Sequence, residues 1–138
     1  MSRADELERF LQTIPFARTL GMRCEILGDE MTAVLPYESK LIGNPTIPAL
    51  HGGAIGSFLE LTAMAQVFLS GELAKPPKTI DVTIDYLRSG RTQDVFARCR
   101  IVKLGRRIAS ARAEAWQSRR DEPIATLSAH FLVAQAEE

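Results

Sequence analysis

The stretch of residues 52–71 restricts the fold more than any other part of the chain. Glu60 is its single charged side chain, and helix-forming Ala, Leu, Met and Gln are frequent over residues 54–69. Apolar groups fall on every side of the helical projection, and Gly71 supplies a stop signal. The stretch therefore predicts a helix over residues 51–71 that is buried on nearly its whole circumference. Such a helix needs a sheet wrapped around it.

The carboxylate inside this apolar helix is the anomaly of the sequence. A buried charge must be paired, hydrogen-bonded or neutralised, and an intramolecular partner for Glu60 would be the simple structural explanation. However, His51, Gly52 and Gly53 directly precede the helix. Glycines at a helix N-terminus leave backbone N–H groups open to a ligand. The combination favours a functional site over a structural ion pair.

The length, charge and composition of the whole chain limit the possible classes of protein. Its 138 residues suit one domain, residues 1–138, and 17 basic residues balance 17 acidic ones. Charge therefore suggests neither a nucleic-acid partner nor a membrane partner. Glu60 and Gln66 interrupt the most apolar window, which predicts that it does not span a bilayer. Acidic residues stand where a signal peptide would be apolar, so a cytoplasmic protein is expected.

The two cysteines point to no metal site. Cys24 and Cys99 stand singly in strand-like segments, without the spacing of a ligand pair. We interpret them as reduced residues of the core, and we expect no metal.

The remaining elements follow in a simple order. Ser2 as N-cap and apolar residues at helical spacing predict a helix over residues 1–15 that Pro15 ends. Alternating residues on either side of 28–29 predict a hairpin, and residues 37–50 a loop. Four alternating segments predict strands at 79–87, 94–104, 108–117 and 125–133. In the third, every second residue is alanine, which lets a sheet approach a thick helix closely. The pattern predicts an α+β domain whose antiparallel sheet curls round one long helix.

This arrangement resembles the hotdog-fold thioesterases, and among them the phenylacetate-pathway type of acyl-coenzyme A (CoA) thioesterase. The resemblance covers nearly the whole chain from about residue 16 to residue 133. It rests on Asn44, His51-Gly52-Gly53, Glu60 and the strand over residues 79–88. The acid is Glu where many relatives carry Asp, and the loop from Asn44 to His51 is one residue longer. The resemblance implies a homodimer that hydrolyses acyl-CoA thioesters.

The residues support the same chemistry. Thioester hydrolysis needs an attacking water or carboxylate and donors that hold the oxygen as it gains charge. Amides at Gly52 and Gly53 offer such donors, and Glu60 can serve as general base or as nucleophile. Gly52 and Glu60 are eight residues apart, about 12 Å along a helix. One carbonyl carbon cannot contact both from the same chain, which predicts a two-fold dimer with shared sites and an inactive monomer.

Three further residues are candidates at this site. His51 is interpreted first as a cap or loop-bonding residue, and second as a proton-transfer group. Asn44 could bond the substrate or water, or simply form the turn before Pro45. Thr79 matches a position where relatives carry a hydroxyl that holds water, although strict alternation would place it on the polar face with Asp81.

Substrate-binding candidates flank the strand ends and line the helix. Because CoA carries phosphates, we expect a basic rim, with solvated side chains as the alternative. Its candidates are Arg88, Arg91, Lys103, Arg106 and Arg107, and acyl-pocket candidates are Phe58 and Met64, unless these belong to the core. No cofactor is expected, because CoA is part of the substrate.

Two other functions are compatible with the sequence. One is a non-catalytic acyl- or aryl-CoA binding protein, although such a protein has no reason to bury an acid beside an acyl group. The other is a structural oligomer in which a buried arginine pairs with Glu60. Aryl, short and medium acyl groups, acyl-carrier protein in place of CoA, and a dimer of dimers all remain open.

Overall fold

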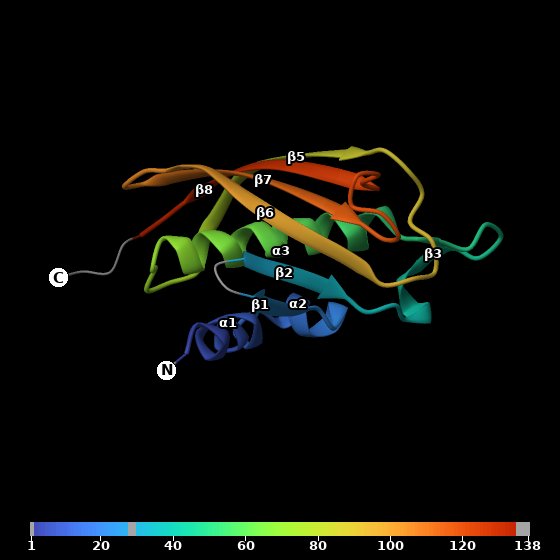
Figure 1. The fold of residues 1–138 in the computed structure, drawn as a ribbon, viewed down its shortest axis with the longest axis horizontal. Helices are drawn as coiled ribbons and strands as arrows, with labels where there is room; N and C mark the ends of the chain where they lie inside the picture. The colour runs from blue at the N-terminus through green and yellow to red at the C-terminus, as the bar shows by residue number, and fades with distance from the viewer. Residues whose placement is uncertain (1, 28–29, 135–138) are drawn as a thin grey trace.

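A computed structural model describes residues 2–27 and 30–134 of the chain. It is an α+β domain in which one sheet covers one long helix, as the sequence predicts (Figure 1). The elements in chain order are α1 (Arg3–Gln12), α2 (Pro15–Leu20), β1 (Arg23–Leu27), β2 (Glu30–Leu35), the 3₁₀ turn η1 (Ser39–Leu41), β3 (Ile42–Asn44), β4 (Ala49–Leu50), α3 (Gly52–Ser70), β5 (Lys78–Tyr86), β6 (Val95–Leu104), β7 (Ile108–Trp116) and β8 (Ala125–Leu132).

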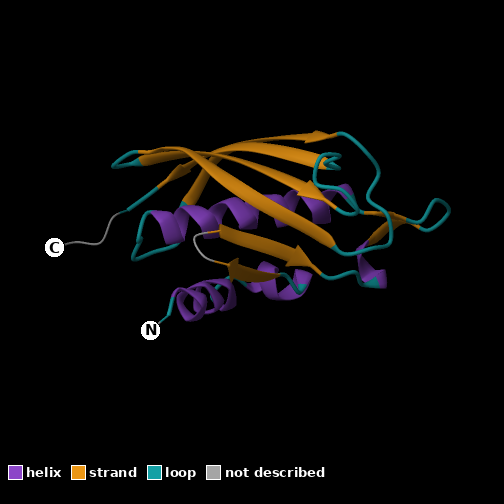
Figure 2. Ribbon diagram, in the orientation of Figure 1, coloured by secondary structure: helices purple, strands orange, loops and turns teal. Residues whose placement is uncertain are grey.

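The main sheet has the strand order β1-β2-β6-β7-β8-β5, and all of its neighbouring strands are antiparallel. Helix α3 lies under the inner face of this sheet, and α1 and α2 lie below it beside β1, in contact with α3 (Figure 2). Strand β5 forms one edge of the sheet. The paired strands β3 and β4 form a separate small ribbon before α3.

Alanines on β7 allow the close contact between sheet and helix. Ala109, Ala111, Ala113 and Ala115 are all buried, and they face a helix whose Phe58 and Leu59 are fully buried. Small side chains on one surface and large ones on the other fill the core without overpacking. By length and composition α3 could also cross a bilayer, contrary to our expectation from the sequence, but half of it is packed inside this fold.

The N-terminal region differs from the prediction. The first helix ends at Gln12, not at Pro15, and Pro15 instead begins α2 at its first position. Proline is well tolerated there because the first N–H groups of a helix have no intrahelical partner. Gly21 then ends α2 with φ 73°, a left-handed conformation that favours glycine. The predicted turn at residues 28–29 lies outside the described residues.

A β-bulge interrupts the regular alternation of β5. Thr79 pairs with Phe131 and Asp81 pairs with His130, so Ile80 is an extra residue between two consecutive partners. Ile80 is accordingly 52% exposed, and Thr79 faces the same side as Val82 and Ile84. The bulge therefore turns the first residues of the strand toward α3.

Candidate active site

One face of α3 is not covered by the sheet. Gly53, Ser57, Glu60 and Met64 follow one another at helical spacing, and each is at least partly exposed. Glu60 is thus half-buried, not enclosed as the sequence suggested. Among the described residues no arginine, lysine or histidine lies within ion-pair distance of it. A structural ion pair therefore does not explain the acid.

The hydroxyl of Thr79 is the hydrogen-bond partner of Glu60. Its Oγ1 donates to Glu60 Oε2 at 2.7 Å, across the boundary between β5 and α3. The expectation that Thr79 shares the polar face with Asp81 is wrong, because the bulge at Ile80 reverses the direction of its side chain. The bond holds one carboxylate oxygen, and no hydrogen bond within the described residues engages the other.

His51 caps α3. Its ring Nδ1 accepts a hydrogen bond of 2.9 Å from the Gly53 N–H, and this favours the capping interpretation over proton transfer. The amide of Gly53 is therefore engaged within its own chain. In the described part of the chain no hydrogen bond uses the Gly52 N–H, which leaves it as the amide open to a ligand.

Tyr86 is a residue of this region that the sequence analysis missed. Its hydroxyl donates to the Gly52 carbonyl at 2.6 Å, and a side chain at Gly56 would meet the same hydroxyl at 2.9 Å. In the sequence, the only indication of this contact was the position of an aromatic residue at the end of an alternating strand. Gly52 and Tyr86 line a cavity of about 350 Å³ together with Leu50 and Arg88.

Asn44 forms the turn in the loop before α3. Its Oδ1 accepts hydrogen bonds from the backbone of Thr46 at 3.0 Å and Ile47 at 3.4 Å. This is the turn-forming alternative considered from the sequence. The Asn44 side chain oxygen is thereby occupied within the loop.

The basic candidates separate into two groups at opposite ends of the sheet. Arg88 and Arg91 follow β5 near Tyr86, on the side of Gly52; Arg88 Nη1 donates to the Pro123 carbonyl, and the Arg91 backbone bonds the Gln117 side chain. Lys103, Arg106 and Arg107 lie at the turn between β6 and β7, where Ile108 pairs with Leu132. One chain cannot bring both groups to one phosphate.

The two apolar candidates also separate. Phe58 is 0% exposed and belongs to the core, so its assignment to the acyl pocket is corrected. Met64 is half-buried and lies one turn beyond Glu60 on the uncovered face of α3.

Burial controls the chemistry of the thiols. Cys24 and Cys99 are free, and desolvation raises the pKa of each from 9.0 to about 12. At pH 8 we expect iodoacetamide to alkylate them about a thousandfold more slowly than in the urea-unfolded chain, because the thiolate reacts. The folded thiols also keep their protons when unfolded ones ionise. Their contribution to stability is full below pH 9 and falls as the pH rises toward 12. Equal alkylation rates in the folded and the urea-unfolded chain would contradict the raised pKa of the thiols.

No group of three or more His, Cys, Asp or Glu residues within residues 2–27 and 30–134 is arranged to hold an ion. The elements present are a carboxylate, a hydroxyl and an open helix amide, and these suit acyl transfer to water.

Comparison with known proteins identifies the family. The model of the thioesterase superfamily matches residues 48–124. The medium/long-chain acyl-CoA thioesterase YigI of Escherichia coli K12 is 32% identical over 123 residues, covering 78% of each chain. The chain belongs to the thioesterase superfamily, and its class of activity is thioester hydrolysis.

Solved structures agree on the fold. A protein of Chromobacterium violaceum has 36% identity and a TM-score of 0.76, with 98% of both chains covered. A phenylacetic acid degradation-related thioesterase of Ralstonia eutropha has a TM-score of 0.77 over 92% of this chain and 98% of its own. At 21% identity the second shows the fold alone. The hotdog fold predicted from the sequence is confirmed.

Proposed function

We propose that the protein hydrolyses acyl-CoA thioesters to a free acid and CoA. The observation that carries this proposal is the Glu60 carboxylate, held by Thr79 on the uncovered face of α3. The relative YigI, named for medium- and long-chain acyl-CoA, supports CoA esters as the substrate class. The proposed reaction uses water, one carboxylate and one amide, and takes no cofactor.

The chemistry proceeds in two steps. As general base, Glu60 takes a proton from water while the water oxygen bonds to the carbonyl carbon, and the carbonyl electron pair moves to oxygen. The Gly52 N–H stabilises that oxyanion at the positive end of α3. The carbonyl then re-forms, the carbon–sulfur bond breaks, and the thiolate takes the proton from Glu60. In the alternative, Glu60 itself bonds to the carbon, the carbon–sulfur bond breaks, and the CoA thiolate leaves and takes a proton from solvent. Water then hydrolyses the resulting anhydride to the free acid and the Glu60 carboxylate.

A second subunit completes the site in this proposal. Gly52 and Glu60 lie on one continuous helix, about 12 Å apart along its axis, so they cannot act on the same carbon. Strand β5 is an edge strand with exposed Ile80, exposed Leu87 follows its end, and the adjoining face of α3 is uncovered. A two-fold dimer that joins these edges places Gly52 of one subunit opposite Glu60 of the other.

Arg88 and Arg91 suit the CoA phosphates better than the second basic group. Arg88 lines the cavity at Gly52, and Arg91 follows Gly90, whose carbonyl accepts a hydrogen bond from the Leu50 N–H. A partner subunit would therefore bring both arginines to the carbonyl together with its amide. Lys103, Arg106 and Arg107 lie at the other end of the sheet.

The direct test measures thiol release from a panel of aliphatic and aryl CoA thioesters. We expect the purified protein to hydrolyse at least one class with kcat/KM above about 10⁴ M⁻¹s⁻¹, the lower range for enzymes. Binding of CoA esters without hydrolysis anywhere in the panel would instead establish the binding protein.

Thr79→Val tests the hydroxyl that positions Glu60. A hydrogen bond to a charged group contributes about 1.5–3 kcal/mol, so we expect kcat to fall by about ten- to a hundredfold. KM and the melting temperature should change little, because valine fills the same space. Thr79→Ser is the matched control and should restore most of kcat. An unchanged kcat in the valine variant would show that the bond is not used.

A further inference from the structure

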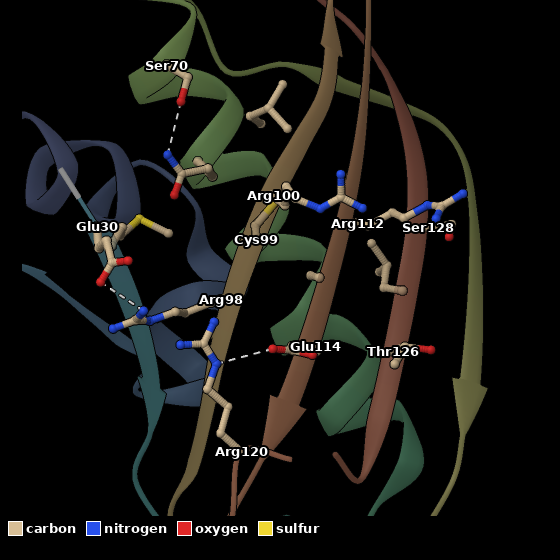
Figure 3. A pocket seen from close by; sticks show the side chains of 15 residues that line it. Glu30, Ser70, Arg98, Cys99, Arg100, Arg112, Glu114, Arg120, Thr126 and Ser128 are labelled. Atoms are coloured by element: carbon tan, nitrogen blue, oxygen red, sulfur yellow. Dashed lines mark hydrogen bonds and ion pairs between the residues drawn. The ribbon is translucent and has the colours of Figure 1, made fainter. Parts of the chain in front are cut away.

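A group of four arginines lies on the outer face of the sheet, away from α3. Figure 3 shows them with hydroxyl side chains of β8 beside them. They line a cavity of about 750 Å³. The members of this arginine cluster are Arg98, Arg100, Arg112 and Arg120, and the neighbouring hydroxyls are Thr126 and Ser128.

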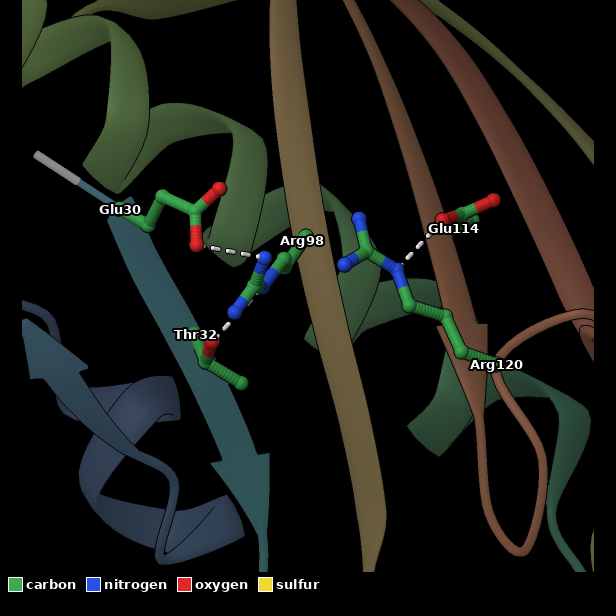
Figure 4. Close-up of polar contacts among 5 residues, drawn as sticks. All are labelled: Glu30, Thr32, Arg98, Glu114 and Arg120. Atoms are coloured by element: carbon green, nitrogen blue, oxygen red, sulfur yellow. Dashed lines mark hydrogen bonds and ion pairs between the residues drawn. The ribbon is translucent and has the colours of Figure 1, made fainter. Parts of the chain in front are cut away.

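Two of the four arginines are neutralised by nearby acids. Arg98 donates to Glu30 Oε2 and to Thr32 Oγ1, each at 2.9 Å (Figure 4). Arg120 donates to Glu114 Oε1 at 3.3 Å and lies over the ring of Trp116. These two pairs form the sides of the cavity and contribute little net charge to it.

Arg100 and Arg112 have no such compensation. They are direct cross-strand partners on β6 and β7, and Arg112 in turn lies opposite Ser128. Within the described residues neither guanidinium has an acidic partner within 4.0 Å or a hydrogen bond. Like charges directly opposite each other destabilise an antiparallel pair. The pair is therefore a cost to folding that the chain itself does not offset.

The Arg100–Arg112 pair also lies beside an opening in the sheet. Within the described residues, strands β2 and β6 are joined by three residue pairs, the last of them Ala33 with Ala97, and β6 continues past them without a partner on that side. The cavity extends into this gap as far as Gln66 and Ser70 of α3, whose side chains are hydrogen-bonded to each other at 3.0 Å. A continuous sheet would present a flat surface here.

We propose that Arg100 and Arg112 bind the phosphate group of a phosphorylated small molecule in this cavity. A dianion between two guanidinium groups removes their repulsion and accepts paired N–H donors from each. The hydroxyls of Thr126 and Ser128 supply further donors, and the volume suits a molecule of nucleotide size. The phosphate could belong to the nucleotide portion of CoA or to a separate metabolite.

The test uses calorimetric titration with pyrophosphate and with adenosine 3′-phosphate 5′-diphosphate. We expect Arg100→Gln and Arg112→Gln to weaken binding at least tenfold, while Arg119→Gln, an exposed loop variant, binds as the wild type does. Without ligand, both cavity variants should melt about 2 °C higher, since the repulsion is relieved. Absence of binding to the wild type, or equal binding to the cavity variants, would overturn the proposal.

Steady-state kinetics of the variant that combines Arg100→Gln and Arg112→Gln distinguishes the two sources of phosphate. If the CoA nucleotide occupies the cavity, KM for an acyl-CoA rises by the factor by which nucleotide binding weakens. If KM is unchanged while pyrophosphate binding is lost, the ligand is a separate phosphorylated molecule. Both results require that the arginine pair binds phosphate, and each identifies one of the two sources of that phosphate.

Discussion

Glu60→Gln should lower kcat for acyl-CoA hydrolysis by at least about a thousandfold while leaving the protein folded. Glutamine keeps the shape of the side chain and can accept the hydrogen bond from Thr79 Oγ1, but it neither takes a proton nor attacks a carbonyl carbon. Thiol release and circular dichroism of both proteins provide the measurement. A folded Gln variant with wild-type kcat would remove Glu60 from the mechanism.

A single turnover in ¹⁸O-labelled water distinguishes general-base catalysis from a nucleophilic route in which water attacks the Glu60 carbonyl of the anhydride. If Glu60 acts as base, the label enters the product acid in the first turnover. If it acts as nucleophile and water attacks its carbonyl, the first label stays on Glu60.

Replacement of Gly52 tests the proposed oxyanion donor. Gly52→Pro removes the N–H and adds a ring, and the position tolerates proline: it is the first residue of α3, and His51 before it has φ −64° and ψ 130°. A side chain at Gly52 meets Tyr86 at 3.5 Å, an ordinary contact. We expect the proline variant to lose about a hundred- to a thousandfold in kcat.

Gly52→Ala is the matched control, since it adds the same first carbon and keeps the N–H. It should retain most of the activity. Equal losses in both variants would show that space at the helix end, not the amide, limits the reaction.

Mixing the two inactive variants tests the shared site. In a dimer of Glu60→Gln and Gly52→Pro chains, one site carries both changes and the other carries neither. Random reassociation makes half of the dimers mixed, so activity should return to about a quarter of the wild type. A mixture that stays inactive after verified subunit exchange would place both groups of a site in one chain.

The central helix and its sheet were predictable because their signals are compositional. A stretch of helix formers with a single charged residue, followed by four alternating segments with alanines on one face, admits few arrangements. Helix α3 begins and ends within one residue of the prediction. The end of the first helix was not predictable in the same way, because a proline can end one helix or begin another, as Pro15 does.

The contacts at the site depended on single residues. Strict alternation misplaces Thr79, because an extra residue in a strand leaves no mark in a pattern of apolar and polar letters. The spacing of His51 and the glycines suggested a cap, but not that the ring would occupy the Gly53 amide and leave Gly52 open. The basic residues near strand ends gave no indication of which end faces the reacting group.

The extra residue Ile80 shifts the register of β5 against β8 by one position. From Asp81 onward one register with β8 directs Val82 and Ile84 inward, while Lys78 and Thr79 pair with β8 in a register shifted by one residue, which presents Thr79 to Glu60. Chain length at this point therefore matters as much as residue identity. During divergence of such enzymes, loss of one residue here would move the hydroxyl to the opposite surface even if every side chain of the site were retained.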